Sequence, residues 1–135
     1  MTAHQFLETR FAALSAGDYA AVYDSYHEDS PFLQQFSGRS AYIHFAQQQL
    51  GSIAIKSWRC LRQRVLDEKR LEVLLVMELE TDADLQLFYE LALLIETDLN
   101  WRYHSAQKLG VDDYRGLPDQ IDFCHFDSAV EKIRF

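Results

Sequence analysis

The sequence predicts an α+β fold in which helices gather on one face of an antiparallel sheet. Apolar residues recur at helical spacing up to Leu50 and at every second position from Ile53 onward. Short turn-forming stretches divide this second part into four consecutive strands, the pattern of an antiparallel meander. Because 48% of the 135 residues are hydrophobic, we expect residues 1–135 to form one domain with a substantial core.

Three helices are expected before the sheet. The first covers residues 3–15 behind a Thr2 cap, and Gly17-Asp18 ends it and starts the second. The second helix is rich in tyrosine and stops before Pro31, because a proline disfavours the helical conformation in the residue that precedes it. Ser40 is expected to cap the third helix, which ends at Gly51.

Four strands fit residues 53–66, 71–81, 85–96 and 99–109, with turns at 67–69, 82–84 and 97–98. Odd-numbered positions from Leu71 to Tyr103 are nearly all apolar, so we expect that face to lie against the helices. The even-numbered face has an apolar middle and a polar rim, which suits a second subunit better than water. The sequence therefore predicts a homodimer through this face, centred on Leu74, Val76, Phe88, Ala92 and Leu94.

The formal net charge is −8, from 21 acidic and 13 basic residues, which argues against nucleic acid as a partner. One basic stretch, Lys56–Arg70, is followed directly by an acidic strand. A hairpin turn at residues 67–69 sets Arg64 opposite Glu72 and Lys56 opposite Glu80. Cross-strand ion pairs, rather than phosphate binding, then account for the basic stretch.

Several other classes of protein are disfavoured. No apolar run is as long as a membrane span, and the N-terminus lacks a signal-peptide pattern, so we expect a cytoplasmic protein with no membrane partner. Cys60 and Cys124 lie far apart outside any paired motif, which favours two reduced thiols. His4, His44 and His125 show no metal-ligand spacing, and neither a Gly-rich phosphate loop nor a nucleophile elbow occurs. We therefore expect no metal and no cofactor.

Two stretches of the sequence resemble a known family. The first contains Arg10-Phe11, Gly17-Asp18-Tyr19 and Tyr26-His27, and the second contains Glu90 in the third strand and Trp101-Arg-Tyr103 in the fourth. Together they resemble the nuclear transport factor 2-like (cone-fold) superfamily, in particular the YchJ-like, SEC-C-associated middle domain. The resemblance implies about three N-terminal helices on a curved antiparallel sheet, with a pocket at its open end. Glu28 follows His27 where that family has proline, and the family's cysteine-rich zinc motifs are absent from this sequence.

An aromatic cluster with one titratable ring is the first candidate site. Helical spacing places His27 near two tyrosines, and odd parity places three aromatic strand residues on the helix-facing side of the sheet. The predicted ligand-binding residues are Tyr23, Tyr26, His27, Tyr89, Trp101 and Tyr103. Such a cluster suits a small apolar or aromatic molecule. Alternatively, the rings fill the core and His27 ties the helix end to a backbone carbonyl. Asp29 is the nearest carboxylate to orient His27, or it caps the following loop.

Glu90 and His104 form the second candidate. A turn at 97–98 makes them neighbours on the even-numbered face, and a carboxylate that holds an imidazole is typical of a general base. That face lies opposite the helices, so the pair is alternatively a polar contact within the dimer interface. The tail, residues 111–135, contains an expected short helix that ends at 132–135, and its role is open.

Two functional classes remain. The first is a binding domain that takes a small apolar or aromatic ligand, or a protein partner, in the aromatic pocket. The second, implied by the superfamily, is an isomerase, dehydratase or cyclase of the ketosteroid isomerase type with His27 or Asp29 as base. Such enzymes commonly place a carboxylate on the concave sheet face, whereas the predicted register puts no Asp or Glu on helix-facing positions between Leu71 and Ile95. We therefore favour the binding domain and leave the catalytic residues unassigned.

Overall fold

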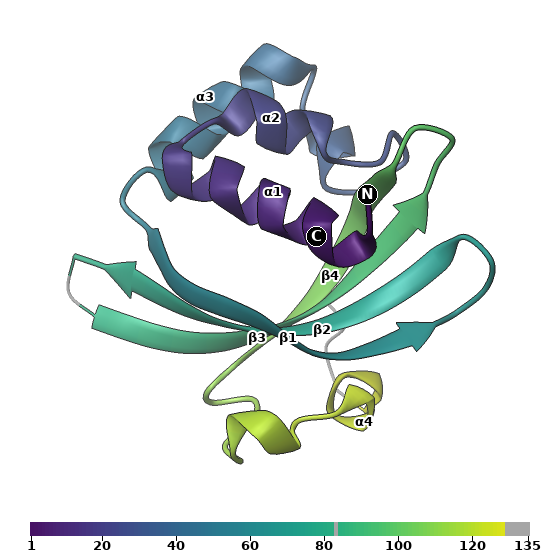
Figure 1. The fold of residues 1–135 in the computed structure, drawn as a ribbon. Coiled ribbons are helices and arrows are strands. Elements are labelled where there is room, and N and C mark those ends of the chain that lie inside the picture. The colour runs from purple at the N-terminus through teal and green to yellow at the C-terminus, as the bar shows by residue number, and fades with distance from the viewer. Residues whose placement is uncertain (83, 129–135) are drawn as a thin grey trace.

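The computed structural model describes residues 1–82 and 84–128 (Figure 1). In these ranges three helices come first, α1 (Ala3–Ala16), α2 (Tyr19–Asp24) and α3 (Arg39–Leu50), with a 3-10 turn, η1 (Leu33–Gln35), before α3. Four strands follow, β1 (Ala54–Val65), β2 (Arg70–Thr81), β3 (Asp84–Glu96) and β4 (Trp101–Gly110), and then η2 (Pro118–Gln120) and α4 (Phe123–Asp127). This order confirms the predicted α+β class. The predicted helix end at residues 132–135 lies outside the described residues.

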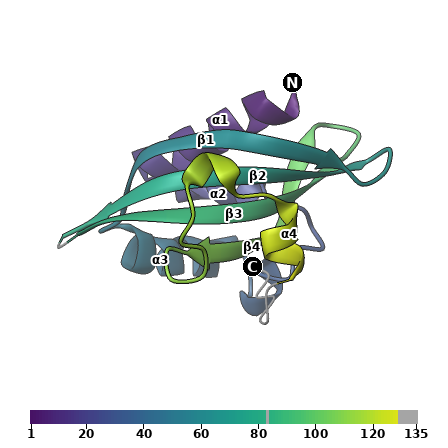
Figure 2. The ribbon, with the colours of Figure 1, turned by 90° about the horizontal axis from the view of Figure 1, so that it is seen from below.

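The sheet separates two layers. Its strands are antiparallel in the order β1-β2-β3-β4. The helices α1, α2 and α3 cover one face, and the tail with η2 and α4 crosses the other (Figures 1 and 2). Figure 1 shows that the sheet curves around the helix layer. The helix layer agrees with the sequence prediction, whereas the cover that the tail makes over the second face was not predicted.

Local caps set the helix boundaries. The side chain of Thr2 accepts a hydrogen bond from the Gln5 backbone, and Gln5 reciprocates, so α1 begins with a capping box. Gly17 ends α1 with φ of +72°, a left-handed conformation that glycine adopts without strain. The prediction of a Ser40 cap is wrong, because α3 already begins at Arg39 and Gly38 occupies the extended cap position. None of the described helices is long and apolar enough to cross a bilayer.

The turn between β2 and β3 reverses the predicted parity of β3. Odd-numbered β2 residues such as Val73 face the helices, as expected. Thr81 pairs with Asp84, so two residues rather than three form the turn, and Val73 lies opposite Ala92. Even-numbered β3 residues therefore face the helices, and Tyr89 lies on the other face with the tail. The prediction that odd positions of β3 face the helices is wrong, because a one-residue change of register moves a whole strand's side chains to the other face.

A bulge in β4 changes the second expected pairing. Leu93 pairs with Ser105 and Leu94 with Tyr103, so the bulge lies at His104. Glu90 consequently lies opposite Lys108, and the predicted Glu90–His104 pair is wrong. The bulge allows Tyr103 on one side of it and Ala106 on the other to pack into the same helix-facing core.

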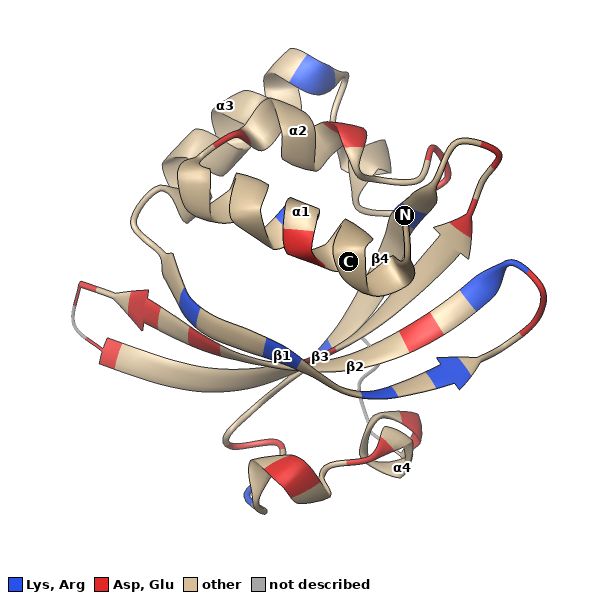
Figure 3. Cartoon of the chain, in the orientation of Figure 1, with Lys and Arg blue, Asp and Glu red and all other residues tan. Residues whose placement is uncertain are grey.

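Cross-strand ion pairs account for the basic stretch of β1. Arg64 lies opposite Glu72, as predicted, and its Nη2 is 2.7 Å from Oε1 of that carboxylate. Lys56 Nζ lies 2.8 Å from Glu80 Oε2, as predicted, although two irregularities shift the backbone register there. Arg59 and Arg64 also reach acidic residues of the tail, and Figure 3 shows the basic positions along β1 above the acidic tail.

The tail covers the face that the sequence assigned to a dimer. Ile121 and Phe126 are both 0% exposed and pack against Leu74, Val76 and other residues of that face. The remaining residues of the predicted interface, Phe88, Ala92 and Leu94, face the helices instead. The predicted grouping is therefore wrong, because its members lie on opposite faces and are covered within one chain. A homodimer stays a prediction and needs another surface.

Candidate functional site

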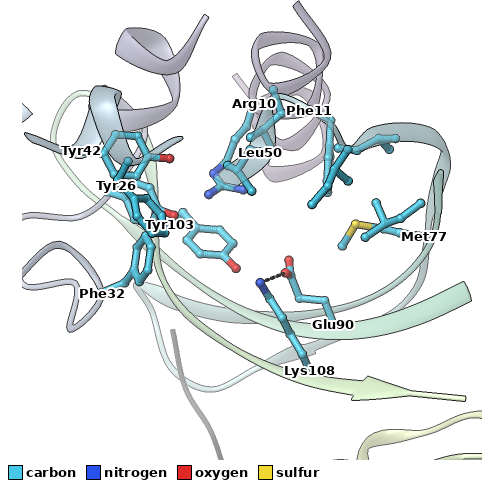
Figure 4. Close-up of a pocket in the computed structure, with 15 residues that line it drawn as sticks. Arg10, Phe11, Tyr26, Phe32, Tyr42, Leu50, Met77, Glu90, Tyr103 and Lys108 are labelled. Atoms are coloured by element: carbon cyan, nitrogen blue, oxygen red, sulfur yellow. Dashed lines mark ion pairs between the residues drawn. The ribbon is translucent and has the colours of Figure 1, made fainter. Parts of the chain in front are cut away.

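A cavity of about 360 Å³ lies between the helix layer and the curved sheet (Figure 4). Nine of the 15 lining residues are aliphatic, phenylalanine or methionine, including Leu14 from α1 and Met77 from β2. The others are three tyrosines and three charged residues: Arg10, Tyr26, Tyr42, Glu90, Tyr103 and Lys108. A mainly apolar cavity with a few polar groups at one place is the usual form of a small-molecule site.

Backbone pairing between α2 and β4 holds the aromatic end of the cavity. The chain that leaves α2 runs beside β4, where the His27 amide donates to the Tyr103 carbonyl (2.8 Å). The Tyr103 amide in turn donates to the Ser25 carbonyl (2.9 Å). These bonds place the Tyr26 and Tyr103 rings edge to face, with centroids 5.4 Å apart. The cavity wall is thus fixed by main-chain contacts as well as by packing.

Arg10 projects from α1 into the cavity (Figure 4). It is 7% exposed, and its guanidinium carbon lies 3.8 Å from the centre of the Tyr103 ring and 5.0 Å from that of Tyr26. Its Nε donates to Ser25 Oγ (3.1 Å). Burial acts to lower the pKa of Arg10, but Tyr26, Tyr103 and Glu90 together raise the pKa above its ordinary value. Arg10 is therefore a permanent cation within an aromatic wall.

Two tyrosines of the wall, Tyr42 and Tyr103, are neutral. Burial, and then the neighbouring Glu90 carboxylate, hold the pKa of Tyr103 well above its usual range. Burial and the adjacent Tyr26 likewise raise the pKa of Tyr42. Both phenols keep their protons at neutral pH, and their hydroxyls are hydrogen-bonded within the wall, Tyr103 to Glu90 and Tyr42 to Tyr26.

Glu90 is the carboxylate that lines the cavity. It is 4% exposed, and its Oε1 lies 3.8 Å from Nζ of Lys108, the residue directly opposite on β4. The prediction that Glu90 lies on the face away from the helices is wrong, because parity reverses in β3. The structure thus corrects the prediction that the helix-facing side of the sheet carries no Asp or Glu. Among the residues that the structure describes, no group of three His, Cys, Asp or Glu side chains is placed to hold a metal ion.

The structure brings together only some of the predicted site residues. Tyr26 and Tyr103 line the cavity. Tyr23 and His27 line a neighbouring, more open hollow between α2 and the β3–β4 turn. Tyr89 lies on the opposite face of the sheet, edge to face with Tyr114 at 5.3 Å. Trp101 packs against the helix-facing core and lines neither hollow. The prediction that these residues converge on one cavity is therefore wrong.

His27 and Asp29, the predicted bases, lie outside the cavity lining. His27 Nδ1 accepts a hydrogen bond from the Asp29 backbone amide (3.1 Å), so the carboxylate of Asp29 does not orient the ring. The imidazole of His27 instead lies 5.8 Å from that of His104, measured between centroids. The alternative interpretation, in which His27 ties the helix end to a backbone carbonyl, is met by its backbone amide, which donates to Tyr103, rather than by its imidazole.

Arg10, Tyr42 and Lys108 line the cavity but were not predicted as site residues, and of these Arg10 carries the clearest sequence signal. It interrupts the apolar stripe of α1, four residues after Phe6 and four before Leu14. Positions at this spacing share one helix face, so the face that meets the sheet carries a charge. A charged residue within an otherwise apolar stripe is the signal that identifies it.

Comparisons with known proteins show the fold and nothing finer. No protein-family description and no curated protein matches the sequence. Among solved structures, the chain is similar to a domain of unknown function with a cystatin-like fold from Nostoc punctiforme. The TM-score is 0.61 at 13% identity, over 93% of this chain and 83% of that one. The protein is thus an α+β protein of cystatin-like fold, in which N-terminal helices precede a four-stranded antiparallel sheet.

Proposed function

We propose that this protein binds a small, mainly apolar or aromatic molecule in the cavity between α1 and the sheet. The observation that carries the proposal is the cavity itself, about 360 Å³ of mainly apolar space between the helix layer and the sheet. Because water occupies about 30 Å³ per molecule in the liquid, this space corresponds to a ligand of roughly a dozen non-hydrogen atoms. The aromatic wall of Tyr26, Phe32 and Tyr103 offers ring faces and edges to such a molecule.

The proposal includes the finer assignment of the fold. The curved sheet, the helix layer on its inner side and the cavity between them support a nuclear transport factor 2-like cone. The stretches at residues 10–27 and 89–103 support the YchJ-like middle domain as the family that this chain resembles. A cytoplasmic location belongs to the same proposal, and the two free cysteines support it.

A cavity-filling variant tests the binding site. Leu79 lines the cavity and Leu85 lies 54% exposed on the same β2–β3 hairpin, outside the cavity. We expect indole, a neutral aromatic probe, to show saturation-transfer NMR signals with the wild-type protein and with Leu85→Trp. The Leu79→Trp variant should lose them, because the larger ring occupies the probe's space. Equal signals from both variants would place the indole site elsewhere.

Proton transfer is the second candidate function, and the position of Glu90 favours it. A nearly buried carboxylate beside an apolar cavity suits the removal of a proton next to a carbonyl group. The test is the exchange of α-deuterium from 1-indanone, followed by NMR. Exchange that Glu90→Gln abolishes, and that Glu78→Gln on the other face of the sheet leaves intact, would establish catalysis. If the wild-type protein exchanges the deuterium no faster than buffer without protein, catalysis is excluded for this substrate and binding remains the proposed function.

A further inference from the structure

The charges around the cavity are unevenly paired. Glu90 and Lys108 form one ion pair. Arg10, by contrast, makes a single hydrogen bond, from Nε to Ser25, and no ion pair among the residues that the structure describes. A guanidinium has five N–H donors, so the two Nη groups of Arg10 keep unused donors. Arg10 is therefore a nearly buried cation that the Glu90 charge acts on without a direct ion pair among the described residues.

The geometry directs these donors toward the cavity. Ser25 occupies Nε, and the guanidinium carbon lies over the Tyr103 and Tyr26 rings. Figure 4 shows the guanidinium reaching into the space above Tyr103 and Glu90. Because Nε is fixed by Ser25, the remaining N–H donors lie on the two Nη groups at the cavity end of the side chain. A planar fork of this kind matches a carboxylate, which accepts two parallel hydrogen bonds.

The net charge of the residues that line the cavity indicates which ligand charge the cavity favours. Arg10 and Lys108 contribute two positive charges and Glu90 one negative charge, so the cavity has a net charge of +1. A monoanion balances this charge, whereas a neutral ligand leaves Arg10 desolvated without a partner and a dianion adds an uncompensated negative charge. Glu90 and Lys108 already satisfy each other, which leaves Arg10 as the group that needs the anion.

Resting on the function proposed above, we propose that the ligand is a monocarboxylate with an apolar body of roughly a dozen non-hydrogen atoms, and that Arg10 binds its carboxylate. The apolar body lies along Phe11 and Met77, on the part of the lining away from the tyrosines (Figure 4). Ionised carboxylic acids of this size are thus the class of molecule that the cavity selects.

Two probes of equal size separate charge from shape. 3-Phenylpropanoate and 3-phenylpropanamide have the same number of non-hydrogen atoms, but only the acid is ionised at neutral pH. In calorimetric titrations of the full chain at pH 7 we expect the acid to bind about 10- to 100-fold more tightly than the amide. Octanoate and octanamide repeat the comparison with an aliphatic body and show whether the cavity prefers an aromatic ring.

Single substitutions test whether Arg10 causes the preference for the acid over the amide. Arg10→Met keeps the length of the side chain and removes the charge, so the acid should lose its advantage of about 10- to 100-fold while the amide binds as before. Arg39→Met is the matched control, because Arg39 is exposed and pairs with Asp24 away from the cavity. Glu90→Gln should tighten acid binding about 3- to 10-fold, since it removes the negative charge nearest the site.

The outcomes distinguish this inference from the proposed function. If acid and amide bind the wild type equally, the carboxylate inference is overturned and the apolar site stands. If neither probe pair binds although indole does, the inference is also overturned. If indole fails as well, both proposals fall. Should Arg10→Met not fold, the acid-to-amide ratio of the wild type and the effect of Glu90→Gln still decide the matter.

Discussion

Replacing Arg10 by methionine should make the ligand-free protein more stable, although it removes the group to which we assign the ligand's carboxylate. The reason is that Arg10 is 7% exposed and forms no ion pair with the described residues. Its charge is held away from water without a full set of partners, which costs free energy in the folded state. Methionine fills a similar volume and carries no charge.

The magnitude follows from the contacts that the substitution changes. Replacing a buried ionic group by a well-packed apolar side chain stabilises a protein by up to about 4 kcal/mol. Against this stand the loss of two cation–π contacts, about 1 kcal/mol each, and of one hydrogen bond, about 1 kcal/mol. Ser25 Oγ keeps its bond to the Val22 carbonyl (2.6 Å), so no hydroxyl donor is left unpaired. The net expectation is a gain of about 1 kcal/mol, or about 4 °C in Tm.

The same substitution at Arg64 is the matched control with the opposite sign. Arg64 bonds to Glu72, whose side chain is 9% exposed, and to Asp127 of the tail. Arg64→Met leaves the Glu72 carboxylate buried without its cation, which should lower the free energy of unfolding by about 3 kcal/mol. Both variants replace one arginine by methionine, so the difference between their stabilities reports whether the arginine has a buried carboxylate partner.

Urea unfolding at pH 7, followed by circular dichroism without added ligand, measures both variants. A gain for Arg10→Met together with a loss for Arg64→Met would support the reasoning. A loss of more than about 1 kcal/mol for Arg10→Met would refute it, because that value would show that the fold compensates the charge of Arg10 and needs it for stability.

Three further predictions concern the tyrosine wall, the tail and the corrected register. Because the pKa of Tyr103 is raised in the folded state, its contribution to stability is complete below about pH 10 and declines as pH rises, by about 1.4 kcal/mol per unit. In urea titrations, the free energy of unfolding of Tyr103→Phe should therefore fall less than that of the wild type between about pH 9 and 11. An equal fall in both proteins would contradict a raised pKa of Tyr103. Phe126→Ala should cost about 3–5 kcal/mol, since the ring is 0% exposed beneath the sheet, whereas a loss under about 1 kcal/mol would mean that the tail is undocked. Ala92→Glu should lower stability by about 3 kcal/mol without changing the mass measured by light scattering, because Ala92 lies in the helix-facing core, and a stable variant of altered mass would restore the predicted dimer face.

Signals close together in the sequence predicted the elements well. Thr2, Gly17 and Asp18 act through caps within their own helices, and the strand boundaries follow from turn residues between apolar runs. The pairing of Arg64 with Glu72 was predictable for the same reason, because a short hairpin joins their strands. Tertiary packing did not need to be known for any of these features.

The face of the sheet on which each side chain lies was less predictable, because an error in the length of one turn changes the face of every residue in the next strand. One residue fewer in the β2–β3 turn reversed every side chain of β3, and the bulge at His104 restored the direction of Tyr103. Tyr89 was therefore assigned to the pocket and Glu90 away from it, when the reverse holds. A bulge depends on the packing of both faces, so the sequence of β4 alone does not reveal it.

The most direct test of the central claim is the methyl NMR signal of Met77 during a titration with 3-phenylpropanoate. The chain has two methionines, Met77, which is 4% exposed and lines the cavity, and Met1, which is 67% exposed and lies outside its lining. The account predicts a saturable shift of the Met77 signal, with a dissociation constant equal to the calorimetric one, and an unchanged Met1 signal. Calorimetric binding that leaves the Met77 signal in place would contradict it, because the carboxylate would then occupy another site.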